Sequence, residues 1–394
     1  MKLKLLIALV LLIPALSSAQ NSFQLSDQAQ ISVITCGPDQ NELYAAFGHS
    51  AIRVYDPVHG IDDAFNYGIF DFDQPNFYLN FTRGYLYYKL GVYSYPLFRD
   101  AYISHNRFIH EQILNLSSEQ KQKLFDYLVW NAAPENQTYR YDYFYNNCAT
   151  KVRDVFTDVL KEEISFDGSF ITTDYTIRQL TDLYLSPLPW GDLGIDICLG
   201  LPMDKKATPY EYMFLPDYIE SSFNHASILV DGERKNLVSQ TISVFESQPT
   251  STGFNWFHPL LIFGIILSLG SWATWREWRN NKISSRIDYL LFTICGLIGL
   301  LLLILWTMTD HQAAARNFNL LWALPTHLLV PYLIWKNPKW AKYYFITTSG
   351  ILLLLLVGWF MLPQQLNISL LPLLALLLVR SGWRVYHISQ AASR

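Results

Sequence analysis

The fold is decided by residues 141–150, which read YDYFYNNCAT. The aromatic residues favour a strand, and the two asparagines end it. From Cys148 onward, apolar residues recur at the spacing of one helix face: Val152, Val155, Phe156, Val159 and Leu160. Asn147 suits the N-cap, because its side-chain oxygen can accept a hydrogen bond from a free backbone N–H of the first turn. We therefore predict a strand, a turn and a helix that begins at Cys148.

At the start of that helix, the sulfur of Cys148 would lie where backbone N–H groups point and the helix dipole is positive. This setting stabilises the thiolate relative to an ordinary thiol, whose pKa is about 8.5. Cys148 is therefore a candidate nucleophile. The alternative is that Cys148 is a small apolar residue packed into the strand-to-helix corner. A base close to the sulfur would favour the nucleophile.

A candidate base lies upstream in AAFGHSAIRVYDP, residues 45–57. The residues alternate from His49 onward, which predicts a strand with His49 near its start. A second strand is predicted over residues 64–70, after a turn-rich segment. A hairpin of these strands would bring Asn66 beside His49. Asp56 and Asp71 are close enough in the sequence to take the same role, so the third residue stays open.

Gly-His-Ser opening a strand, a second strand with a polar residue, and Asn-Cys opening a helix resemble the circularly permuted NlpC-type, papain-like thiol fold. The resemblance implies an α+β domain in which His49 is the base and Cys148 the nucleophile. It also implies a polar residue that orients the imidazole, for which Asn66 is the first candidate. We expect no cofactor and no metal, because the spacing of His and Cys matches no zinc motif.

The start of the chain is typical of an exported protein. Residues 1–19 contain two lysines, an apolar run too short to cross a membrane, and then SSA, as in a secretory signal peptide. Export permits disulfides, and Cys36 with Cys198 is the pair we consider, although spacing alone does not establish it. The net charge of −4, without a basic stripe, argues against a nucleic-acid partner.

The composition divides the chain into two domains. Residues 20–255 have a soluble composition rich in Tyr and Phe, whereas residues 256–394 are dominated by apolar runs. We predict an all-α transmembrane bundle of about five helices, at residues 257–275, 287–309, 318–335, 343–362 and 368–386. Lys and Arg concentrate in the loops expected to be cytoplasmic, and the outer loops hold only Arg316. The chain is thus predicted to be a multi-pass inner-membrane protein with its N-terminal domain in the periplasm.

Three further segments carry expectations. The loop at residues 309–319 is polar and lies on the same side of the membrane as Cys148. We expect it to bind a lipid head group or to dock the exported domain, through Asp310, His311, Arg316, Asn317 and Asn319; an ordinary solvated loop is the alternative. The aromatic residues of segment 77–88 are expected mostly in the core. The Pro- and Gly-rich segment 186–209 is expected to be a loop that can act as a lid.

The signal peptide, the Gly-His-Ser and Asn-Asn-Cys motifs, and a multi-span tail whose outer loop reads DH and then NFNLLW together resemble Lnb, the lipoprotein N-acyltransferase family of the Bacteroides group. The resemblance covers essentially the whole mature chain. It implies transfer of a fatty acyl chain from a membrane phospholipid, through a Cys148 thioester, to the α-amine of the diacylglyceryl-cysteine of a lipoprotein. A peptidoglycan amidase or peptidase and a non-catalytic envelope sensor or scaffold remain alternatives. The multi-span anchor favours the lipid substrate.

Overall fold

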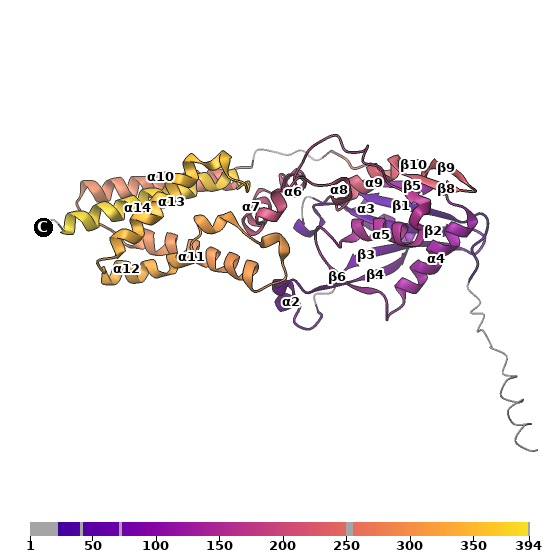
Figure 1. The fold of residues 1–394 in the computed structure, drawn as a ribbon, viewed down its shortest axis with the longest axis horizontal. Helices are drawn as coiled ribbons and strands as arrows, with labels where there is room; N and C mark the ends of the chain where they lie inside the picture. Colours follow the sequence, from indigo (N-terminus) through magenta and orange to yellow (C-terminus); the bar gives the residue numbers. More distant parts are fainter. Residues whose placement is uncertain (1–22, 40–41, 71–72, 250–254, 393–394) are drawn as a thin grey trace, which may run out of the picture.

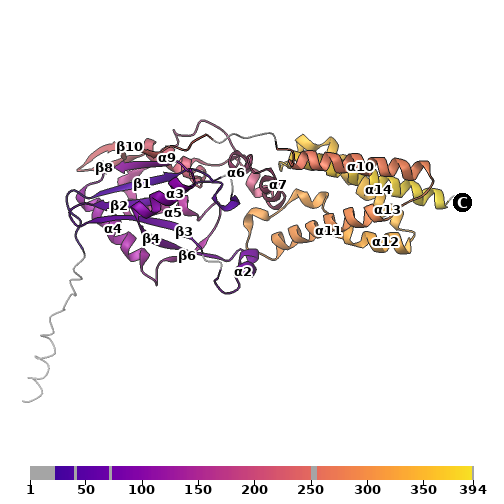
Figure 2. The ribbon, with the colours of Figure 1, turned by 180° about the vertical axis from the view of Figure 1, so that it is seen from behind.

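The computed structural model describes residues 23–39, 42–70, 73–249 and 255–392. The predicted signal peptide and Asp71 lie outside these residues. Figure 1 shows an elongated molecule in which a sheet-containing part at one end is joined to a bundle of helices at the other. The view from behind in Figure 2 shows the same arrangement, with the C-terminus at the end of the bundle far from the sheet.

The described residues of the N-terminal part contain a seven-stranded sheet in the order β10-β5-β1-β2-β3-β4-β6, in which every pair of neighbours is antiparallel. The hairpin predicted from the sequence is formed by β2 and β3. The strands are β1 (Gln30–Cys36), β2 (His49–Asp56), β3 (Ile61–Ile69), β4 (Leu86–Ser94), β5 (Ile109–Leu114), β6 (Thr138–Tyr141) and β10 (Val238–Phe245).

Alternate residues of a strand point to opposite faces of the sheet, and here each face packs into its own core. In β1, Ile31 and Val33 belong to the larger core, whereas Ile34 and Cys36 belong to a smaller one. The larger core contains side chains of α4 (Ser118–Ala132), α5 (Cys148–Leu160) and α9 (Pro216–His225). The smaller core is closed by α3 (Tyr95–Ser104).

The segment at residues 186–209 is not the loop that the sequence predicted. It contains the helix α7 (Pro189–Cys198) and a short 3-10 turn at Leu201–Asp204. Pro189 stands at the start of α7, where a missing N–H costs nothing. Leu193 packs into the core of the membrane helices. The tertiary contact thus stabilises a helix where composition indicated a loop.

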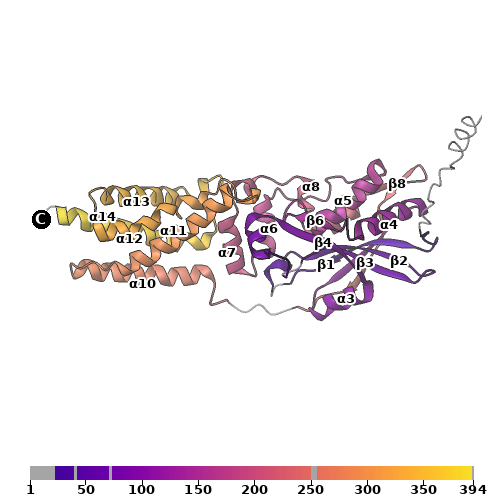
Figure 3. The same ribbon diagram turned by 90° about the horizontal axis from the view of Figure 1, so that it is seen from below.

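The remaining elements of the N-terminal part lie around the sheet. Figure 3 shows α6 and α7 between the sheet and the bundle. These elements are α2 (Phe77–Arg83), α6 (Ile177–Leu185), α8 (Pro209–Tyr212) and a small antiparallel sheet of β7 (Ile164–Ser165), β8 (Ser227–Val230) and β9 (Glu233–Asn236).

Among the described residues, four segments of the C-terminal part are long and apolar enough to cross a membrane: Pro259–Arg279, Arg286–Thr307, Phe318–Lys336 and Ile368–Gln390. The third is built from 3-10 turns followed by α12 (Val330–Lys336). The fifth expected span is the shorter apolar helix α13, Ala341–Val357. The other helices are α10 (Pro259–Arg279), α11 (Arg286–Thr307) and α14 (Leu371–Ala392).

A buried ion network ties three of these helices, α10, α11 and α14, together. The fully buried guanidinium of Arg380, on α14, donates to both carboxylate oxygens of Asp288 on α11, at 2.6 and 3.0 Å. It also donates to Glu277 on α10 at 3.0 Å. Removal of Asp288 would leave Arg380 with Glu277 as its one carboxylate partner among the described residues, so the network favours this packing of the helices.

Candidate active site

Cys148 is the first residue of α5, as predicted, and Asn147 is its N-cap. The Asn147 side-chain oxygen accepts from the backbone N–H of Thr150 at 2.9 Å, and the Thr150 hydroxyl accepts from the Asn147 N–H at 2.8 Å. The Asn147 amide also donates to the carbonyls of Tyr143 and Phe214. These bonds fix the turn before α5 and hold the sulfur at the helix N-terminus.

His49, at the start of β2, and Asn66, on β3, are brought together by the hairpin. The His49 Nε2 and the Asn66 Oδ1 lie 2.5 Å apart. With Nε2 donating to this oxygen, Nδ1 is the ring nitrogen left to accept a proton from Cys148. One face of the imidazole stacks on Tyr102, at 6.1 Å between ring centroids. The ring is therefore held by a hydrogen bond and by an aromatic neighbour.

The electrostatics of the pair favour a thiolate. Burial by itself would raise the pKa of Cys148, but the neighbouring charge and hydrogen bond of His49, with backbone N–H groups of Ser50 and Ala149, lower the pKa below that of an ordinary thiol. Burial would lower the pKa of His49, but the charge of Cys148 and hydrogen bonds to Cys148 and Asn66 raise it. These opposite shifts are those expected of a thiolate–imidazolium pair.

Gly68 leaves the space in front of this pair open. Its φ of +94° lies in the left-handed region, which glycine adopts most easily. A Cβ there would lie 3.6 Å from the Cβ of Cys148 and 3.9 Å from the His49 Cε1. The β3–β4 pairing is irregular between Asn66 and Ile69, so the strand bends beside Cys148 and His49.

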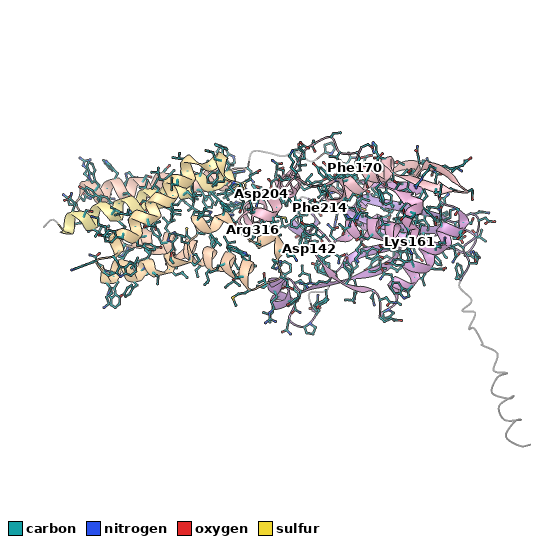
Figure 4. The ribbon with its side chains drawn as sticks, viewed as in Figure 1. Asp142, Lys161, Phe170, Asp204, Phe214 and Arg316 are labelled. Carbon is teal, nitrogen blue, oxygen red and sulfur yellow. The ribbon has the colours of Figure 1, made fainter. Side chains whose placement is uncertain are left out.

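The three candidate residues line a cavity of about 270 Å³. Figure 4 shows Phe214, which lines the cavity, and Asp142 towards the end of the N-terminal part that faces the membrane helices. Arg107 also lines it, and neither motif nor spacing in the sequence indicated this residue. The cavity wall is mainly aromatic: Tyr44, Phe47, Phe70, Tyr88, Tyr102, Tyr141, Tyr143, Phe144 and Phe214. Such a wall suits an apolar substrate.

The structure excludes two alternatives that the sequence left open. Asp56 ends β2 at the opposite end from His49, about 23 Å away at roughly 3.3 Å per residue. Its carboxylate instead accepts from Ser26 and bonds His59, so it does not orient the imidazole. All four cysteines are within the described residues and are free thiols, so Cys36 and Cys198 are not bonded. Cys36 is buried in β1, opposite His49.

The outer loop at residues 309–319 joins the two parts of the molecule. Asp310 pairs with Arg140 at 2.6 Å, and His311 donates to the carbonyl of Phe81 at 3.0 Å. Asn317 and Asn319 are buried and donate to backbone carbonyls at the end of α7. These four side chains therefore form hydrogen bonds or ion pairs with the protein itself. The sequence analysis had offered two roles for them, binding of a lipid head group or docking of the exported domain.

Arg316 differs from its neighbours in the outer loop. It is exposed, and no ion pair or hydrogen bond of its side chain is found within the described residues. Figure 4 shows it at the boundary between the two parts of the molecule. Of the five loop residues, Arg316 is therefore the one free to contact a lipid head group.

The aromatic segment 77–88 is mostly exposed, which corrects the expectation of core packing. Phe77, Leu86 and Tyr88 are buried, but Tyr78 is 76% exposed and Leu79 51%. Helix α2 contacts the outer loop, since the Arg83 carbonyl accepts from the Asp310 N–H at 3.0 Å. Exposed aromatic residues beside a membrane span are typical of the membrane–water interface.

The described residues contain one group of carboxylates close enough to hold a cation. Single oxygens of Asp182, Asp192 and Asp196 lie within 4.8 Å of one another. The Asp196 carboxylate already accepts from Arg178 at 2.7 Å and from Asn367 at 3.0 Å. Proximity of carboxylates alone does not make a metal site, so we assign none.

Comparison with known proteins gives two matches to family models. Residues 18–182 match the Lnb N-terminal periplasmic domain, and residues 250–391 match the Lnb transmembrane domain. Neither the curated proteins nor the solved structures gave a significant match. The order of the two matched domains agrees with the mixed α/β part and the apolar helices described above. The matches indicate a multi-pass inner-membrane protein with a periplasmic N-terminal domain and a function of the lipoprotein N-acyltransferase type. The chain therefore belongs to the Lnb family.

Proposed function

We propose that the protein transfers a fatty acyl chain from a membrane phospholipid to the α-amine of a lipoprotein's diacylglyceryl-cysteine, through a thioester on Cys148. The observation that carries the proposal is the group of Cys148, His49 and Asn66 in an aromatic-lined cavity. We assign the reaction to residues 20–255 and membrane anchoring to residues 256–394. A lipid substrate gives a reason for joining a thiol domain to so many apolar helices.

In the first step, Cys148 loses its proton to His49 and its sulfur attacks an ester carbonyl of the phospholipid. Backbone N–H groups at the start of α5 can donate to the oxyanion that develops on the carbonyl oxygen. The C–O bond of the ester then breaks and a C–S bond is retained. The lysophospholipid leaves after its oxygen takes the proton from the His49 imidazolium.

In the second step, the lipoprotein amine attacks the carbonyl of the thioester. His49 accepts a proton from the amine and returns it to the Cys148 sulfur as the C–S bond breaks, which restores the free thiol. Formation of an amide from a thioester is favourable, provided that water does not reach the intermediate first. The aromatic wall of the cavity supports this exclusion of water.

We also propose that the N-terminal domain is a circularly permuted relative of the NlpC-type, papain-like thiol fold. The base and its orienting residue stand on neighbouring strands, β2 and β3, which come before the nucleophile's helix in the chain. Helix α5 packs against the same sheet, through Val152 and Phe156 in the larger core. This combination of a strand-borne His and a helix-borne Cys supports the relationship.

The proposed function is tested with the full-length protein in detergent. It is incubated with a phospholipid carrying a labelled acyl chain and with a diacylated lipopeptide, and the peptide mass is measured. The wild type should add one acyl chain, whereas Cys148→Ala should add none. Cleavage of peptidoglycan fragments without acyl transfer would favour the amidase or peptidase, and no reaction on either substrate would favour the sensor or scaffold.

A further inference from the structure

The cavity of Cys148 contains a buried cation, Arg107, which the reaction above does not use. Arg107 precedes β5 and is only about 9% exposed. Its Nε donates to the Gly37 carbonyl at 2.6 Å, and its guanidinium lies 4.5 Å from the centre of the Tyr102 ring. Since Tyr102 also stacks on His49, the guanidinium is held in a fixed orientation next to the reactive pair.

Arg107 differs from the other buried arginines in the described residues, because they all pair with carboxylates. Arg153 pairs with Asp154, Arg178 with Asp196 and Asp204, and Arg380 and Arg384 with Asp288. No ion pair joins Arg107 to a carboxylate in the part of the chain that the structure describes. Its two terminal nitrogens have no hydrogen-bond acceptor among the residues that the structure describes. A buried charge is unfavourable without a partner, which indicates an anionic ligand.

We propose that Arg107 binds the phosphodiester of the donor phospholipid and so places an ester carbonyl at the Cys148 sulfur. This subsite rests on the proposed function. In a glycerophospholipid, the glycerol unit joins the phosphate to the acyl esters, so a carbonyl at Cys148 requires the phosphate to lie in the same cavity. The planar N–H pairs of a guanidinium match the spacing of phosphate oxygens.

In this role Arg107 is a substrate-binding residue that selects the acyl donor. It takes no part in the second step, the attack of the lipoprotein amine on the thioester. The lipoprotein amine arrives after the lysophospholipid has left, so the acceptor does not need the phosphate subsite. A neutral acyl ester has no phosphate and should reach Cys148 without help from Arg107. The choice of donor therefore separates phosphate binding from an effect of Arg107 on the reactive pair.

The test compares wild type, Arg107→Gln and Arg107→Lys, as full-length proteins in detergent, with two donors. One donor is a diacyl phospholipid and the other is a p-nitrophenyl acyl ester. Arg107→Gln should lower kcat/KM for the phospholipid by about 10- to 100-fold, the size expected for a lost hydrogen-bonded charge contact. The neutral ester should be cleaved at a rate within about threefold of wild type, and Arg107→Lys should retain an intermediate phospholipid activity.

A matched control is Arg153→Gln, which removes a buried arginine that stacks on Tyr210 and does not line the cavity. It should change the ratio between the two donors by less than about twofold, and iodoacetamide should still alkylate Cys148 in every variant. Equal losses on both donors in Arg107→Gln, or unchanged use of the phospholipid, would overturn the phosphate subsite. If the wild type cleaves the neutral ester but takes no acyl chain from phospholipid, the proposed function fails as well.

Discussion

Replacement of Asn66 by alanine tests how the candidate base is positioned. Asn66 is buried, and its Oδ1 lies 2.5 Å from the His49 Nε2. When His49 becomes an imidazolium, this is a hydrogen bond to a charged group, which contributes roughly 1.5–3 kcal/mol. At about 1.4 kcal/mol per tenfold change, Asn66→Ala should lower kcat/KM for acyl transfer by about 10- to 100-fold. Cys148→Ala should abolish acyl transfer, whereas Asn66→Ala should retain a measurable fraction of it.

The same substitution should change the pH dependence of the thiol. The hydrogen bond to Asn66 helps to raise the pKa of His49, and the His49 charge helps to lower the pKa of Cys148. Without Asn66, the imidazolium is lost at a lower pH and the thiolate forms at a higher pH. Alkylation of Cys148 by iodoacetamide should then be slower near neutral pH and should recover as the pH rises. Asn66→Asp, which keeps an acceptor oxygen, should restore the wild-type profile in large part.

Asp56→Asn is the control, because Asp56 lies on the same strand as His49 but at its far end. It should lower thermal stability through its lost bonds to Ser26 and His59 and should leave the alkylation profile unchanged. The reasoning is refuted if Asn66→Ala keeps both the wild-type kcat/KM and the wild-type pH profile. A larger loss in Asp71→Ala than in Asn66→Ala would assign the orienting role to Asp71.

Three further predictions follow from the rest of the structure. Asp288→Ala leaves buried Arg384 without a carboxylate partner among the described residues and leaves Arg380 with Glu277 alone. It should destabilise the membrane bundle by about 3–5 kcal/mol, seen as a lower Tm in detergent, and an unchanged Tm would contradict the network. Arg316→Ala should weaken transfer from phospholipid vesicles, whereas Asn319→Ala should mainly lower stability, and equal effects of both on KM would contradict this division. A cysteine in place of the exposed Gln312 should react with an impermeant reagent from the periplasmic side, and cytoplasmic labelling would invert the topology.

The sequence alone was sufficient to predict the features that depend on residues close together in the chain. The turn and helix at Cys148 follow from the capping ability of Asn147 and from the apolar spacing after it, both of which act within a few residues. The β2–β3 hairpin depends on strands that are close in the chain, so the contact of His49 with Asn66 was also predictable. The apolar runs of the C-terminal part similarly predict membrane helices without any knowledge of their packing.

Tertiary structure decided the features that depend on residues far apart in the chain. The composition of segment 186–209 is typical of a loop, yet the segment contains the helix α7. Two long-range contacts stabilise this helix: Leu193 packs against the membrane helices, and the side chains of Asn317 and Asn319 donate to the carbonyl of Ile197 near its end. The sequence gives no sign that Arg107 reaches the cavity of Cys148, because β5 joins β1 through a long-range pairing. Pattern and capping act over neighbouring residues, whereas burial, ion pairing and cavity shape are set by which distant elements meet. The position of Cys148 at the start of α5 therefore followed from the local sequence, whereas the place of Arg107 in the same cavity depended on the tertiary fold.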